Sequence, residues 1–146
     1  MNLSDLSASL RDCERCRLSS ERTQVVFGTG NPQASIMFVG EAPGFYEDRQ
    51  GEPFVGAAGK LLTELLQSIG LTRSDIYIAN VIKCRPPNNR DPLPDEIDTC
   101  KPFLLQQIEF IHPKLVCTLG NYATQKILKK KVGITKVRGQ VIQMPQ

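Results

Sequence analysis

The sequence predicts an α/β fold of three layers, with a mostly parallel central sheet between two layers of helices. Three short apolar runs, at 35–40, 76–81 and 115–120, have the length and composition of buried strands. Two predicted helices lie between them: 56–70, where apolar residues recur at helical spacing, and 94–111, which is bounded by helix start and stop signals. Strands that alternate with helices favour parallel pairing, with right-handed crossovers that cover both faces of the sheet.

Both predicted helices carry start and stop signals. The first helix runs up to Gly70, and glycine is a common helix stop. The second begins at Pro94, which two acidic residues follow, and acidic residues suit the positive end of the helix dipole. It ends before Pro113, and the loop that precedes it, at 85–94, is rich in proline and asparagine. Beyond the third strand we expect a helix capped by Asn121, and then an extended tail.

Four cysteines form the most informative pattern in the chain: Cys13, Cys16, Cys84 and Cys100. The first two form a C-x-x-C pair, and two distant thiolates complete a four-sulfur cage, which suits an iron–sulfur cluster. Such a cage suits zinc less well, because structural zinc sites usually take their ligands as two close pairs. A zinc site and a set of buried, unpaired thiols remain alternatives. Cys117, in an apolar run, is expected in the core.

The cysteine count and the chain ends also bear on the compartment. Five cysteines are an odd number, and the first residues lack the apolar stretch of a secretory signal. A reducing interior is therefore expected, where cysteines more often bind metal than form disulfides. No apolar run is long enough to span a membrane.

Length and charge are consistent with a nucleic-acid-binding domain. The chain of 146 residues suits one domain, 1–146, with a substantial core. Residues 1–109 hold 11 Lys and Arg against 15 Asp and Glu, whereas residues 110–146 hold seven basic residues and no acid. This asymmetry fits a polyanion partner, and it also fits an ordinary solvated face.

Polar residues follow the predicted strands at the edge where ligands bind in open parallel sheets. The first strand ends in Gly40-Glu41-Ala42-Pro43-Gly44, and the second ends near Asn80. Glycines in such a turn let backbone N–H groups approach a ligand closely. Phe54 lies in the loop after the first strand. Each residue also has an ordinary interpretation: an exposed Glu41, an asparagine that caps a turn, and a phenylalanine that covers the core.

Three motifs occur in order along the chain. They are Gly40-Glu41-Ala42-Pro43-Gly44, Pro53-Phe54-Val55-Gly56-x-Ala58-Gly59 and Asn80-x-x-Lys83-Cys84-Arg85-Pro86-Pro87-x-Asn89-Arg90. Together with the four cysteines, they strongly resemble the family 4 uracil-DNA glycosylases, the iron–sulfur members of the uracil-DNA glycosylase superfamily. The resemblance runs from about Cys13 to the end of the chain.

The resemblance implies that the four cysteines hold a 4Fe–4S cluster. It also implies an enzyme that flips uracil out of DNA and hydrolyses its N-glycosidic bond, which starts base excision repair. Phe54 would stack on the flipped base, and Asn80 would read the edge of uracil. Backbone at Gly40, Glu41 and Ala42 would bind the remaining polar atoms of the base.

The resemblance further implies which residues act on the sugar and on the phosphates. Glu41 is the first candidate, and Glu47 the second, for a carboxylate that stabilises positive charge on the sugar and orients water. The expected partner is uracil-containing DNA, in the cytoplasm and nucleoid of a prokaryote, and a sliding clamp is expected by family analogy only. Phosphate contacts are expected from the C-terminal lysines and from Lys83, Arg85, Asn89 and Arg90.

The chain departs from the family pattern after residues 137–139. There the family continues with another strand, a His-Pro motif, a DNA-penetrating loop and a final helix, whereas this sequence ends at Gln146. His112, the only histidine, is expected to be a helix cap or a surface residue and cannot fill the missing role. We therefore expect a truncated member with weak or absent excision, because losing one such donor costs about 2.7–4 kcal/mol. The alternatives are a non-catalytic iron–sulfur nucleic-acid-binding module and a structural zinc domain.

Overall fold

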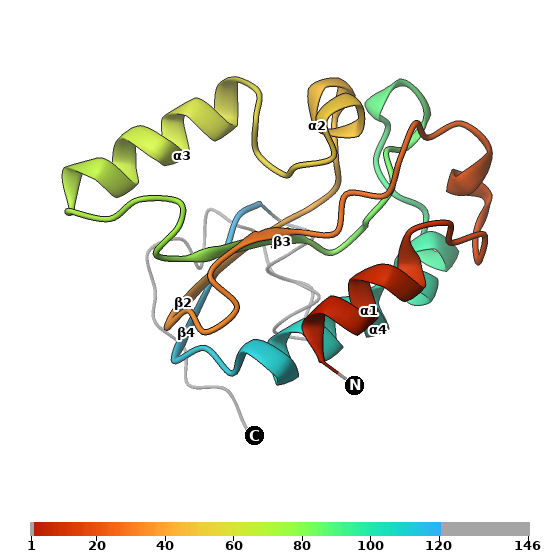
Figure 1. The fold of residues 1–146 in the computed structure, drawn as a ribbon. Helices are drawn as coiled ribbons and strands as arrows, with labels where there is room; N and C mark the ends of the chain where they lie inside the picture. Colours follow the sequence, from red (N-terminus) through yellow and green to blue (C-terminus); the bar gives the residue numbers. More distant parts are fainter. Residues whose placement is uncertain (1, 121–146) are drawn as a thin grey trace.

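The computed structural model describes residues 2–120, which form a four-stranded sheet with helices on both of its faces (Figure 1). The strand order is β1-β3-β2-β4. The central strand β2 (Ile36–Gly40) runs parallel to β3 (Tyr77–Asn80) and to β4 (Leu115–Thr118), while β1 (Thr29–Gly30) is antiparallel to β3. The prediction of a mostly parallel α/β sheet is confirmed.

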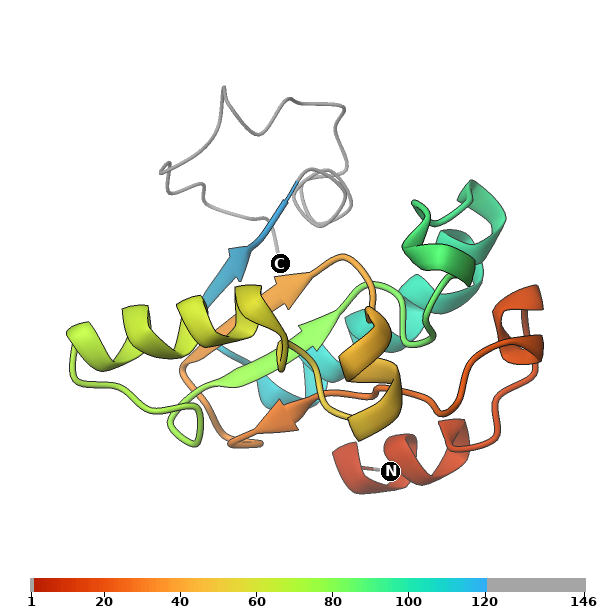
Figure 2. The ribbon, with the colours of Figure 1, turned by 90° about the horizontal axis from the view of Figure 1, so that it is seen from above.

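Helices from the two crossovers lie on opposite faces of the sheet. The connection from β2 to β3 carries α2 (Phe45–Gln50) and α3 (Ala57–Ser68), which lie in front of the sheet in Figure 2. The connection from β3 to β4 carries α4 (Pro94–Ile111), which shares the other face with α1 (Leu3–Leu10). Two crossovers in opposite directions require this arrangement if both are right-handed. Short 3₁₀ helices η1 (Arg17–Ser20) and η2 (Pro87–Asn89) lie in the connecting loops.

The alternation of side chains along the strands divides the core into two clusters. On β2, Met37 and Val39 pack in the cluster that contains Leu104 of α4. The intervening side chain of Phe38 packs with Leu62 of α3 in the second cluster. Residues of a strand point alternately to the two faces, so a sheet covered on both faces is apolar at every position.

The two long helices match their predicted ranges, but α3 is less buried than its leucines suggest. Only Leu62 and Leu66 are buried, whereas Leu61, Leu65 and Ile69 are each more than half exposed. Helix α4 ends where the sequence predicts, at a C-cap residue, His112, with a left-handed φ of 53°. The expectation that His112 caps a helix is confirmed.

Several expectations fall outside the residues that the structure describes. They are the helix beginning at Asn121, the extended tail, the C-terminal lysines and the part of the single domain beyond residue 120. Within residues 2–120, no helix is both long and apolar enough to cross a membrane.

Candidate active site and cysteine pocket

The carboxyl ends of β2 and β3 bring three predicted site residues together. Gly40 and Asn80 are register partners in the parallel pair. A Cβ atom built on Gly40 would lie 2.5 Å from Asn80 Oδ1 and 2.5 Å from Phe54 Cζ. The Asn80 side chain and the Phe54 ring therefore meet directly over Gly40, where only glycine leaves room. Asn80 is 3% exposed and Phe54 is half-buried, so both are shielded within this edge of the sheet.

The backbone of Phe54 is held in an unusual conformation by groups that the sequence did not single out. Its φ of 55° is rare for an aromatic residue. The guanidinium of Arg73 donates hydrogen bonds of 2.7 Å to the carbonyl oxygens of Pro53 and Phe54. Gly59, at the start of α3, packs so closely that a Cβ there would lie 1.7 Å from the Phe54 oxygen. Arg73 and Gly59 together fix the backbone from which the Phe54 ring projects.

Glu47 braces the same loop from the other side. Its Oε1 accepts a hydrogen bond of 2.9 Å from the amide of Gly44, and its Oε2 accepts bonds of 3.0 Å from the amides of Val55 and Gly56. Both carboxylate oxygens are thus engaged by backbone, which ties the glycine turn after β2 to the Phe54 loop. Glu47 therefore has a structural role in this loop, and its predicted catalytic role stays a prediction.

Glu41 follows β2 directly, and its side chain is half-buried. Its carbonyl oxygen accepts a hydrogen bond of 3.0 Å from the amide of Ile82, which pairs the two chain segments beyond the strand ends. Burial, and then the negative charge of Asp91, raises the pKa of the Glu41 carboxyl above its ordinary value. A carboxyl with a raised pKa at the edge where the strands end is a candidate functional group.

Lys83 does not lie at a phosphate-binding surface, and that prediction is wrong. The side chain is 2% exposed, and its Nζ donates to the carbonyl oxygen of Asn80 at 2.7 Å and to Oε1 of Gln107. Gln107 in turn donates from Nε2 to the carbonyl oxygen of Phe27 at 2.8 Å. Burial lowers the pKa of Lys83 to about 8. Lys83 therefore supports the end of β3 from inside the molecule.

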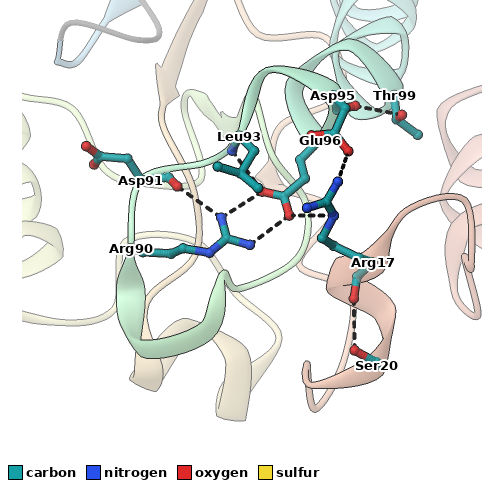
Figure 3. A network of polar contacts seen from close by, with 8 residues as sticks. All are labelled: Arg17, Ser20, Arg90, Asp91, Leu93, Asp95, Glu96 and Thr99. Carbon is teal, nitrogen blue, oxygen red and sulfur yellow. Dashed lines mark hydrogen bonds and ion pairs between the residues drawn. The ribbon is translucent and has the colours of Figure 1, made fainter.

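Arg90, whose side chain is partly exposed, forms an ion pair with a buried carboxylate (Figure 3). Its two terminal nitrogens donate to the two carboxylate oxygens of Glu96, each at 2.8 Å, and the Glu96 side chain is fully buried. Glu96 also accepts from the amide of Leu93 at 2.8 Å, and Arg17 Nε lies 3.8 Å from it. The hydrogen bond from Arg90 holds the pKa of Glu96 below its ordinary value. Arg90 thus pairs with the buried Glu96, and its predicted contact with a phosphate stays a prediction.

The other two predicted phosphate contacts lie nearer the surface. Arg85 is half-buried and Asn89 is exposed, and Arg85 Nε donates to Asn89 Oδ1 at 2.7 Å. The structure leaves both as candidates for contact with nucleic acid.

The four predicted metal ligands line a single pocket between η1, α4 and the segment after β3. Its walls are largely apolar, from residues such as Leu10, Leu18 and Ile82. Within residues 2–120, no three Cys, His, Asp or Glu side chains come close enough to hold one metal ion. The lining thiols are Cys13, Cys16, Cys84 and Cys100.

Hydrogen-bond donors point at three of these sulfur atoms. Arg15 lies 3.4 Å from Cys13 Sγ, Arg22 lies 3.4 Å from Cys84 Sγ, and the amide of Lys83 lies 3.3 Å from Cys100 Sγ. Burial raises the pKa of Cys84 to about 12, so this thiol stays protonated unless a metal displaces the proton. Two of these donors are arginine guanidinium groups, and such donors beside sulfur atoms fit a site that would carry negative charge when it is loaded.

Comparison with known proteins identifies the family of this chain. Residues 27–146 match the family model described as the uracil DNA glycosylase superfamily. The chain belongs to this superfamily.

Within the superfamily, the similarity is to the type-4 enzymes. The chain is 50% identical to the type-4 uracil-DNA glycosylase of Archaeoglobus fulgidus over 147 aligned residues, which cover 98% of this chain and 74% of that relative. It is 51% identical to the Sulfurisphaera tokodaii protein of the same name, with 95% and 66% covered, and 53% identical to the Thermotoga maritima one, with 94% and 72% covered. The chain thus spans 66% to 74% of the length of these relatives.

Proposed function

We propose that this chain has the activity of a type-4 uracil-DNA glycosylase, which flips uracil out of DNA and hydrolyses its N-glycosidic bond to start base excision repair. The observation that carries the proposal is the meeting of Asn80 and Phe54 over Gly40, in a chain about half identical to proteins of that name. Such an enzyme would act on DNA in the cytoplasm and nucleoid of a prokaryote.

Recognition would depend on the shielded carboxamide of Asn80. Its Oδ1 would accept from N3–H of uracil, and its Nδ2 would donate to O4. Cytosine presents the opposite donor and acceptor there, and a good bidentate pair discriminates by about 1–3 kcal/mol. The Phe54 ring would stack on the flipped base, and backbone at Gly40, Glu41 and Ala42 would bind its remaining polar atoms.

Bond cleavage would depend on Glu41. Breaking the N-glycosidic bond builds positive charge on the sugar and negative charge on uracil. A carboxylate beside the sugar stabilises that positive charge and orients the attacking water, as in glycoside hydrolysis generally. The half-buried Glu41 fits this role, while Glu47 would shape the pocket through the amides that it binds.

The four cysteines would hold a 4Fe–4S cluster, and the donor set fits it because all four thiols line one pocket with N–H groups aimed at three of them. When bound, the cluster would join the N-terminal segment to the segment after β3. The zinc alternative would give a colourless protein without iron, whereas a cluster would give visible absorption.

Uracil excision from single- and double-stranded oligonucleotides tests the activity, both for this chain and for a version extended by the C-terminal segment of its longer relatives. In the version that excises uracil, Glu41→Gln should lower the single-turnover rate by about 10²-fold or more while the visible absorption of the cluster stays unchanged. Glu52→Gln, at an exposed acid in the loop before Phe54, is the matched control and should keep the rate. Turnover that survives Glu41→Gln would remove Glu41 from the mechanism.

The same assay separates the enzyme from the alternative, a non-catalytic iron–sulfur module that binds nucleic acid. The chain should be assayed beside a version extended by the C-terminal segment of its longer relatives. Selective binding of uracil-containing DNA without excision by either version would favour the binding module.

A further inference from the structure

Helix α2 presents two aromatic side chains to solvent. Phe45 is 42% exposed and Tyr46 is 60% exposed, and their rings meet edge to face with centroids 5.3 Å apart. The opposite side of the helix is anchored, since buried Asp48 accepts a hydrogen bond of 2.8 Å from the amide of Thr23. The aromatic side of α2 therefore faces solvent, because the opposite side is fixed to the protein, and it contributes little to the core.

Two arginines accompany these rings. The guanidinium carbon of Arg49 lies 4.9 Å from the centroid of the Phe45 ring, and that of Arg85 lies 5.3 Å from it. We call Phe45, Tyr46, Arg49 and Arg85 the aromatic–arginine patch. Exposed rings that stack bases, beside guanidinium groups that pair with phosphates, are the chemistry with which proteins bind unpaired nucleic acid.

The patch borders the candidate active site. A Cβ on Gly56 would lie 3.8 Å from Cδ2 of Tyr46, so this ring lies beside the turn that follows Phe54. On the other side, Arg85 donates to Asn89, one of the predicted DNA contacts. Helix α2 itself begins directly after the glycine turn that ends β2. DNA that places a nucleotide over Gly40 would thus bring neighbouring nucleotides within reach of the patch.

We propose that the aromatic–arginine patch binds the nucleotides next to the target in the same DNA strand. An unpaired base stacks on Tyr46, while Arg49 and Arg85 hold the adjoining phosphates. The inference rests on the proposed function, because the target strand supplies the ligand, and it adds a subsite that does not touch the target base. Flipping a nucleotide unstacks its neighbours, and an aromatic platform offers them a new partner whatever their sequence.

The test measures binding of two single-stranded oligonucleotides that differ only in carrying uracil or thymine at the target position, each with 2-aminopurine beside it. Tyr46→Ala should weaken binding of both at least about fivefold, the lower end for base stacking on an aromatic ring, and should abolish the quenching of 2-aminopurine. Tyr46→Phe keeps the ring and should keep both signals. Arg49→Gln should reduce the salt slope of binding by about one. Phe110→Ala, at an exposed aromatic of α4, is the matched control.

The outcomes separate the two proposals. If Tyr46→Ala binds both oligonucleotides as tightly as the unchanged protein, and 2-aminopurine is still quenched, the proposal for the patch is wrong. An equal loss of affinity for heparin, a polyanion without bases, also overturns it, because stacking would then play no part. If the unchanged protein binds uracil and thymine strands equally and excises neither, while Tyr46→Ala still weakens both, the proposed function fails and the patch stands. Thermal unfolding of each variant confirms that exposed positions were changed without loss of the fold.

Discussion

Replacing Gly59 with alanine should displace the loop that carries Phe54. A Cβ at this buried position would lie 1.7 Å from the carbonyl oxygen of Phe54 and 2.1 Å from its carbonyl carbon. Both atoms belong to the backbone, so no side-chain rotation relieves the clash. Ordinary contacts of a Cβ begin near 3.4 Å, and the two backbones must therefore separate by about 1.7 Å.

The separation would break the two hydrogen bonds from Arg73 to the carbonyl oxygens of Pro53 and Phe54. Their length of 2.7 Å would increase beyond hydrogen-bond range. Bonds to a charged group contribute about 1.5–3 kcal/mol each, and the lower value suits a half-buried arginine. The loss of about 3 kcal/mol is offset by about 1 kcal/mol from the better helix propensity of alanine. The net loss of about 2 kcal/mol should lower Tm by roughly 4–8 °C.

Thermal unfolding followed by circular dichroism measures this effect, and binding of uracil-containing DNA should weaken in parallel. Gly56→Ala is the matched control. Its Cβ would make an ordinary contact of 3.5 Å with Glu47 Oε2, so it should cost less than about 1 kcal/mol, as expected at a helix N-cap. If Gly59→Ala unfolds at or above the temperature of the unchanged protein, Phe54 is not held against α3 as described.

Three further variants test other parts of the molecule. Glu96→Gln breaks the buried ion pairs and should lower the free energy of unfolding by about 3 kcal/mol, measured in urea. The raised pKa of Glu41 places the acid limb of the excision rate at a higher pH than an ordinary carboxyl would give, since the rate falls as the carboxylate is protonated. Asp91→Asn should move this limb to lower pH by removing a negative neighbour. Cys84→Ser should lose iron and visible absorption, whereas Cys117→Ser, outside the cysteine pocket, should keep both.

Each of these outcomes has a clear contrary result. If Glu96→Gln leaves the free energy of unfolding unchanged, the buried carboxylate does not stabilise the fold. An acid limb that stays in place in Asp91→Asn would separate the rate from the charge state of Glu41. Full iron content in Cys84→Ser would remove that thiol from the ligand set.

The sequence was most informative where a signal repeats along the chain. Helix α4 was predicted with its observed ends, because proline at its start and before the next strand bounds a long periodic segment. The meeting of Gly40 with Asn80 followed from the rule that parallel strands end at the same edge. Helix α2, with six residues, is too short for a periodic pattern and was not predicted.

The interior of the site was less predictable, because it depends on partners that are distant in sequence. Lys83 was expected at the surface from its charge, yet Gln107, 24 residues later, and the carbonyl of Asn80 supply acceptors that make its burial possible. Arg73 donates hydrogen bonds to backbone carbonyl oxygens, which every residue carries. No sequence motif therefore predicts this role. Arg90 lies in a basic loop, and only the fold shows that it forms an ion pair with the buried Glu96.

The N-terminal segment is held in place by contacts that involve no sulfur atom. Leu6 and Leu10 of α1 and Leu18 of η1 are buried, and Arg17 pairs with Asp95 at the start of α4. The cysteine pocket is thus assembled by packing and ion pairs, in contrast to small zinc domains that fold only when metal binds. For the proposed cluster, this predicts that loading follows folding, so that an apoprotein with native secondary structure should be isolable and then reconstituted with iron and sulfide.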